Sequence, residues 1–146
     1  MLHSVEKEDI SLGMNQNEIT PLLETLLSEL KNSQRISINF REDSFWSNIT
    51  AEAGVYIIRE TNADEILYVG QTVNFFKRMK QVVSAKDRHA KAKTRSRKKG
   101  KIPYYELIKL MYDNPNTYSI SLLEVKLGRL ELEEHIICGH ELIYNY

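Results

Sequence analysis

Two short apolar runs separated by a polar stretch constrain the fold of this chain more than any other feature of its sequence. Residues 55–58 and 66–69 are rich in β-branched and aromatic side chains, which favour strands. Residues 61–65 between them, Thr-Asn-Ala-Asp-Glu, are typical of a turn. The pattern predicts a β-hairpin. A turn centred near Asn62 would place Tyr56 opposite Tyr68, with both phenols on one face of the hairpin.

A helix is predicted directly after the second strand. Gly70 would end that strand and Thr72 would cap the helix. Apolar residues then recur at helical spacing, namely Val73, Phe75, Phe76, Met79, Val82 and Val83. Arg78 lies about 100° from the centre of this stripe and shares a face with Asn74, one turn earlier. A cation and an amide are therefore expected beside the two tyrosines. The alternative is that the tyrosines only pack and that Arg78 is a solvated charge.

With 146 residues, the chain has room for one domain with a real core. No apolar run approaches the roughly 18 residues that a membrane span needs. The first residues lack the basic and then apolar layout of a secretory signal, so a cytoplasmic protein without a membrane partner is expected. Cys138 is the single cysteine, which excludes an intramolecular disulfide and a cysteine-based zinc site.

The formal charge of zero hides a strong segregation of charge. Residues 51–101 carry 13 Lys and Arg against 5 Asp and Glu, whereas the segments on either side are acidic. Most of this positive charge lies in residues 84–101, which interrupt the domain after the predicted Arg78 helix. We interpret this basic insertion as a phosphate-binding loop, and the alternative is a solvated insertion. The candidate nucleic-acid contacts within it are Arg88, Lys91, Lys93, Arg95, Arg97, Lys98 and Lys99.

The first 50 residues are predicted to form an extension of the domain. Residues 1–17 have no periodic pattern and are expected to be a loose tail, whereas residues 17–30 repeat leucines at helical spacing. Residues 36–40 alternate like a short edge strand. Phe45, Trp46 and Ile49 would anchor this extension to the core. It would act as a structural cap or as a recognition or dimerising arm, although nothing in the sequence indicates a homo-oligomer.

The rest of the chain predicts two helices around a third strand. Pro103 is well placed to open a helix that ends at residues 114–116. Residues 118–125 alternate like a strand, and a last helix covers about residues 130–140. Residues 51–146 therefore predict an α+β domain of order β-β-α-α-β-α, with a small, mainly antiparallel sheet of three strands.

One carboxylate of the last helix stands apart from its neighbours. The expected buried direction of this helix is set by Leu130, Leu132, Ile136, Ile137 and Cys138. At roughly 100° per residue, Glu133 points about 20° from that direction, whereas Glu131 and Glu134 point away. A carboxylate in an apolar stripe is costly unless a basic group or a metal ion binds it. Glu133 is therefore either half of an ion pair, with Arg78 as a possible partner, or a metal ligand.

Taken together, these residues resemble the GIY-YIG nuclease family. The defining tripeptides are Gly54-Val55-Tyr56 and Tyr68-Val69-Gly70. The resemblance continues in the family's spacing through Thr72, Asn74, Arg78, Glu133, Ile136-Ile137 and Asn145. It covers residues 53–146, with the basic stretch as an insertion. Several correctly ordered elements are more specific than either tripeptide alone.

The resemblance implies an endonuclease that hydrolyses a phosphodiester of double-stranded DNA with one divalent ion, Mg²⁺ or Mn²⁺. Arg78 would hold the scissile phosphate, and Glu133 would be the sole protein ligand of the metal. One of Tyr56 and Tyr68 would help to deprotonate the attacking water while the other orients it. Gly54, Gly70, Thr72 and Asn145 would support the site, and Asn74 would contact nucleic acid.

The chain also departs from the family pattern. Gln71 stands where the repair branch has a lysine, and Val82 stands where some members have a histidine. Neither departure removes an essential group. The alternative function is a non-catalytic nucleic-acid-binding module that keeps the fold.

Overall fold

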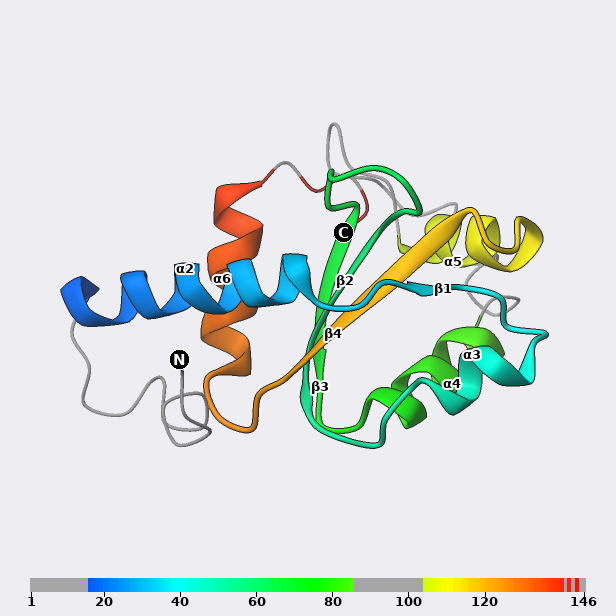
Figure 1. The fold of residues 1–146 in the computed structure, drawn as a ribbon, viewed down its shortest axis with the longest axis horizontal. Helices are drawn as coiled ribbons and strands as arrows, with labels where there is room; N and C mark the ends of the chain where they lie inside the picture. Colours follow the sequence, from blue (N-terminus) through cyan, green and yellow to red (C-terminus); the bar gives the residue numbers. More distant parts are fainter. Residues whose placement is uncertain (1–15, 86–103, 141, 143, 145–146) are drawn as a thin grey trace.

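The computed structural model describes residues 16–85, 104–140, 142 and 144 (Figure 1). The predicted loose tail lies almost entirely outside these residues, and so do Asn145 and the seven basic candidates between Arg88 and Lys99. In chain order the elements are α2 (Gln16–Asn32), β1 (Ile36–Ser37), α3 (Asp43–Ser47), β2 (Gly54–Glu60), β3 (Tyr68–Thr72), α4 (Phe75–Ala85), α5 (Tyr104–Asp113), β4 (Tyr118–Glu124) and α6 (Arg129–Gly139). The predicted order β-β-α-α-β-α is confirmed from β2 to α6.

The sheet has four antiparallel strands in the order β1-β4-β2-β3. The prediction of three strands was therefore wrong by one, because β1 adds to the edge of β4 through the pairs Ile36↔Ile120 and Ser37↔Ser119. Residues 36–40 were expected to be an edge strand, and β1 takes that place. Strand β1 has only two residues and extends the sheet little. The strand order places β4 and β2 at the centre of the sheet.

Helices cover both faces of the sheet (Figure 1). The α2 and α6 helices lie on one side, where leucines of α2 pack with Val55, Ile57, Leu132 and Ile136 in a shared core. The α3, α4 and α5 helices lie on the other side around Tyr56, Ile58, Phe75 and Met79. Strand β2 has its first six residues buried because both faces are covered. The predicted division at residue 50 stays a prediction.

The predicted anchors of the N-terminal extension are confirmed for Phe45 and Ile49, which are 3% and 5% exposed and belong to the core on the α4 side. Trp46 packs against this core and lies edge-on to Phe76 at 5.7 Å. The short helix α3 that carries Phe45 and Trp46 was not predicted. Five residues are too few to show a helical period in the sequence.

The hairpin register differs from the prediction. Tyr56 pairs with Gly70, and Tyr68 pairs with Ile58, so the ladder is displaced by two residues from a turn centred on Asn62. The connection is longer because Ile66, 3% exposed, turns into the core on the α2 side instead of continuing the ladder. A shift of two residues keeps each side chain on its face, so both tyrosines still face α4 and α5.

Candidate active site

Tyr56 and Tyr68 meet on the sheet face that α4 covers. They are diagonal neighbours in the ladder, with ring centroids 6.0 Å apart and an interplanar angle of 37°. Tyr56 is buried, and the Phe75 ring lies edge-on to it at 6.4 Å. Tyr68 is half-buried. The predicted pair of phenols is thus present, although the two residues are not directly opposite.

Two glycines make room for this arrangement. A Cβ on Gly70 would lie 2.5 Å from the Tyr56 Cζ and hydroxyl oxygen, since the ring crosses its cross-strand partner. A Cβ on Gly54 would lie 2.0 Å from the carbonyl oxygen of Leu123 and 2.4 Å from the Phe75 ring. The first and last residues of the two tripeptides are therefore glycines for steric reasons.

Arg78 reaches the tyrosines from α4. Its Nε donates a hydrogen bond of 3.4 Å to the Tyr56 hydroxyl oxygen. Burial by itself would lower the pKa of Arg78, but neighbouring tyrosines, Tyr56 first, raise it above its ordinary value. The guanidinium thus stays charged, and the contact to Tyr56 does not occupy its two terminal nitrogen atoms.

The start of α4 differs from the prediction in one detail. Asn74, and not Thr72, caps the helix, because the Asn74 side-chain oxygen accepts a hydrogen bond of 2.9 Å from the Lys77 N–H. The Thr72 hydroxyl instead accepts the Asn74 N–H at 3.1 Å and shapes the turn before the helix. Its role in support of the site stays a prediction. The side-chain oxygen of Asn74 serves the cap, and the contact of Asn74 with nucleic acid stays a prediction.

Glu133 lies on α6, beside the edge of the sheet. Its helix packs beside β3, the edge strand, and its carboxylate accepts a hydrogen bond from the Gln71 backbone N–H. Burial raises the pKa of Glu133, and the charge of Glu134 raises it further. Arg78 and the Gln71 hydrogen bond oppose this shift, which shows that Arg78 lies within electrostatic reach.

The surroundings of Glu133 are less apolar than the sequence analysis expected. Leu132 and Ile136 are buried, but Leu130 is 60% exposed, and Ile137 and Cys138 are exposed too. The helix turns its narrow buried stripe toward α2 and β2, and this leaves Glu133 half-buried at the β3 edge. Within the described residues, no salt bridge joins Glu133 to a basic side chain, so the alternative of an ion pair with Arg78 is not observed.

The carboxylate of Glu133 suits a hard divalent ion. It offers two oxygen donors, and burial penalises its charge until a cation binds. No group of three or more His, Cys, Asp or Glu side chains that could hold a metal occurs in the part of the chain that the structure describes. Glu133 therefore belongs to no cluster of three such ligands among these residues, and its role as the sole protein ligand stays a prediction.

Tyr104, at the start of α5, is a site residue that the sequence analysis missed. Its ring stacks on Tyr68 with the centroids 3.7 Å apart and the planes at 2°. The sequence offered no signal for this contact, since Tyr104 reads as one more apolar residue of a helical stripe. Long-range packing alone brings it to the two strand tyrosines.

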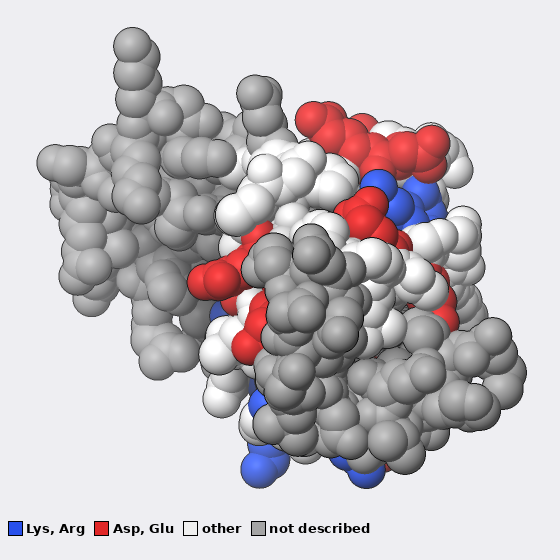
Figure 2. Space-filling view, turned by 90° about the vertical axis from the view of Figure 1, so that its left-hand side faces the viewer, with Lys and Arg blue, Asp and Glu red and all other residues white. Residues whose placement is uncertain are grey.

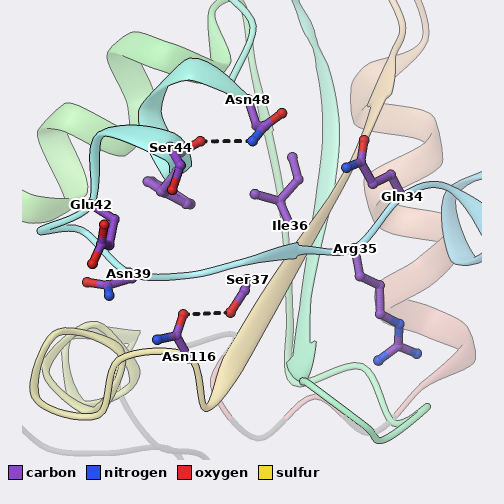
Figure 3. A pocket seen from close by; sticks show the side chains of 10 residues that line it. Gln34, Arg35, Ile36, Ser37, Asn39, Glu42, Ser44, Asn48 and Asn116 are labelled. Atoms are coloured by element: carbon purple, nitrogen blue, oxygen red, sulfur yellow. Dashed lines mark hydrogen bonds between the residues drawn. The ribbon is translucent and has the colours of Figure 1, made fainter.

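A polar pocket at the β1 edge is separate from the tyrosines (Figure 3). Ser37 donates a hydrogen bond of 2.9 Å to the Asn116 side-chain oxygen, and the Asn48 amide donates one of 2.8 Å to the Ser44 carbonyl oxygen. None of its lining residues belongs to the tyrosine site.

A family model described as the GIY-YIG catalytic domain matches residues 52–138, which include both tripeptides, Arg78 and Glu133. The chain belongs to the GIY-YIG family. The matched domain is a nuclease catalytic domain, which supports a nuclease function. A comparison with curated protein sequences gave no match.

Two solved structures are similar to this GIY-YIG chain. One is the GIY-YIG N-terminal endonuclease domain of UvrC from Thermotoga maritima, bound to its catalytic divalent cation, magnesium. It is 14% identical, with a TM-score of 0.43, over 70% of this chain and 93% of the other. The other is a point mutant of the same domain with its catalytic divalent cation. It is 13% identical, with a TM-score of 0.43, over 70% and 92% of the two chains.

Proposed function

We propose that this protein is a divalent-metal-dependent endonuclease that hydrolyses phosphodiester bonds of double-stranded DNA. The observation that carries the proposal is the meeting of Tyr56, Tyr68 and Arg78 on one sheet face, with Glu133 within electrostatic reach around the β3 edge. A binding module needs charge on its surface. It does not need a half-buried carboxylate near two phenols and a part-buried guanidinium contact.

Arg78 would bind the scissile phosphate. Its contact with Tyr56 is long, at 3.4 Å, and involves only Nε. The guanidinium also interacts with Tyr68, and shorter, charge-assisted bonds of its terminal nitrogen atoms to phosphate oxygens would replace these contacts with neutral phenols. The same guanidinium would stabilise the extra negative charge that develops on the phosphate as water attacks. Movement of the guanidinium toward a phosphate would also uncover the Tyr56 hydroxyl.

We propose different roles for the two strand tyrosines. Burial, and next the neighbouring Tyr56, raise the pKa of Tyr68, which therefore keeps its proton and acts as a donor that orients water or phosphate. Tyr56 presents its oxygen to a cation; after releasing its own proton to solvent, its phenolate would accept the proton of the attacking water. The hydroxide formed in this way would attack phosphorus, the bond to the leaving sugar oxygen would break, and that oxygen would take up a proton from solvent water.

Glu133 would hold the metal ion, Mg²⁺ or Mn²⁺, with water and phosphate oxygens as the other ligands. When bound, the ion would supply Lewis-acid stabilisation of the phosphate. The Gln71 backbone N–H holds the Glu133 carboxylate at the sheet edge before any ion arrives.

DNA binding would rest mainly on the basic insertion. On the face shown in Figure 2, acidic and basic side chains of the described residues are interspersed. Nine of the 20 Lys and Arg residues fall within residues 86–101, outside the described part of the chain.

No helix in the described ranges is long and apolar enough to cross a membrane. We propose a cytoplasmic protein whose partner is double-stranded DNA.

The test is cleavage of supercoiled plasmid by the full chain with Mg²⁺ or Mn²⁺. We expect nicking or linearisation that stops when EDTA removes the metal. Arg78→Ala and Glu133→Ala should each lower the rate by about 10²-fold or more, whereas Glu134→Ala, a neighbouring and exposed carboxylate, should cut like the wild type. A wild type that shifts DNA in a gel but never cuts it with either metal would establish the binding module instead.

A further inference from the structure

Tyr104 ties α5 to the strand tyrosines. It is the first residue of α5, and its ring lies parallel to Tyr68 at a centroid distance of 3.7 Å. A second ring at this distance restricts the side-chain rotation of Tyr68, which is otherwise half-buried on an edge strand. Tyr68 thus owes its orientation to a residue 36 positions later in the chain.

The hydroxyl of Tyr104 is buried without a well-formed hydrogen bond. No described residue gives it a hydrogen bond of full geometry, although the Tyr56 hydroxyl lies within its reach, and Tyr68 and the Arg78 guanidinium are also close to it. A buried polar group without a good hydrogen bond destabilises the fold and calls for a reason. Here the unused donor faces the phenol that we propose as the proton acceptor.

The surroundings of Tyr104 keep the proton on its hydroxyl. Burial, and next Tyr56 and Tyr68, raise its pKa well above the ordinary value, while Arg78 opposes the shift. Among the described residues, the charged groups near these phenols are Arg78 of α4 and, for Tyr68, Glu133 of α6. Tyr104 therefore remains a hydrogen-bond donor and is unsuited to act as a base.

We infer that Tyr104 is a positioning residue of the nuclease site, whose ring holds Tyr68 in place and whose hydroxyl donates to the Tyr56 oxygen once Tyr56 has lost its proton. This inference rests on the proposed function. It gives the Tyr56 oxygen two donors, Arg78 Nε and Tyr104 Oη. When Arg78 turns to the phosphate, the Tyr104 hydroxyl still donates to the Tyr56 oxygen.

The experiment compares Tyr104→Phe, Tyr104→Leu and the wild type in steady-state cleavage of one DNA duplex. Tyr104→Phe keeps the stack and removes only the hydroxyl, so we expect kcat to fall about tenfold with KM unchanged. Tyr104→Leu loses the stack too and should fall about tenfold further. Tyr112→Phe is the matched control, because Tyr112 lies on the same helix but stacks on Phe40 at 6.4 Å; it should cut like the wild type.

A second measurement reports the contact without DNA. In protein with ¹³C-labelled tyrosine, brought to a pH at which Tyr56 is ionised, the Cζ resonance of Tyr56 should differ from that of the wild type in Tyr104→Phe and match it in Tyr112→Phe. A Tyr104→Phe variant with wild-type kcat, or with an unmoved Tyr56 resonance, overturns the inference while the proposed function stands. A wild type that does not cut DNA overturns the proposed function and this role of Tyr104 with it.

Discussion

Tyr56 and Gly70 are cross-strand partners, and the Tyr56 ring fills the space that a side chain at position 70 would need. The closest approach of an added Cβ is 2.5 Å, to a ring that Phe75 also contacts edge-on. The glycine of the second tripeptide therefore determines where the tyrosine of the first can lie. Two motifs that are separate in the sequence form one steric unit.

Gly70→Ala should displace Tyr56 and remove most of the activity. Because the ring is buried, it cannot swing away freely, and we expect a cost of about 1–3 kcal/mol in the free energy of unfolding, as for other overpacked cores. Cleavage should fall further than this loss of stability explains. Gly139→Ala is the control, since a Cβ there meets no atom within 4 Å. Equal activity of the two variants would show that Tyr56 needs no fixed position.

The buried phenols should make the folded protein sensitive to alkali. The pKa of Tyr68 is raised in the folded protein, so its contribution to stability is complete below the unfolded value of about 10 and is lost as pH rises above it. We expect the free energy of unfolding, measured in urea, to fall above about pH 10, and to fall less steeply in Tyr68→Phe. Tyr112→Phe should keep the wild-type dependence. Parallel curves for Tyr68→Phe and the wild type would contradict the prediction.

Glu133→Gln should stabilise the metal-free protein and abolish its stabilisation by Mg²⁺. Burial raises the pKa of Glu133, so the contribution of this group to stability is present at low pH and lost as pH rises through the folded-state value. Removal of the charge should therefore raise the melting temperature of the metal-free protein slightly at pH 7. The increase in melting temperature on addition of Mg²⁺ should disappear. In Glu134→Gln that increase should persist; its loss there as well would argue against Glu133 as the metal ligand.

Arg59 should contribute to stability and not to cleavage. It is 3% exposed on the sheet face opposite the tyrosines, and its guanidinium donates to the Lys31 carbonyl oxygen at 3.1 Å and the Ser121 hydroxyl at 3.0 Å. Arg59→Ala leaves a cavity and removes both bonds, so we expect a loss of about 2–4 kcal/mol. Arg41→Ala, an exposed arginine over the Tyr112 ring, should cost less than about 1 kcal/mol. A large fall in the activity of folded Arg59→Ala protein would assign this face a part in cleavage.

The basic insertion should control the salt dependence of DNA binding. We expect charge reversal of Arg95, Arg97, Lys98 and Lys99 to weaken binding and to lower the slope of log K against log salt by about 0.9 for each phosphate that the variant no longer neutralises. Fluorescence anisotropy with a labelled duplex measures both. An unchanged slope would reduce the insertion to a solvated segment.

Most of the fold follows from local patterns in the sequence. The runs at 55–58 and 118–125 and the helical stripes are strong periodic signals, and all appear as strands and helices. The hairpin register did not follow from them, because Ile66 is buried in the core on the α2 side and does not continue the ladder. The cap of α4 was misassigned because Thr72 and Asn74 are both good cap residues, and only the turn geometry selects Asn74.

For the site, the sequence by itself determined which groups are available: two tyrosines on one strand face, an arginine on the following helix and one carboxylate near the end of the chain. Their order and spacing were enough to indicate the family. Only the tertiary structure places Glu133 of α6 beside the edge strand β3 and stacks Tyr104 on Tyr68. Periodicity records which way a side chain points on its own element. The contacts between elements depend on how the layers pack, and no local pattern encodes them.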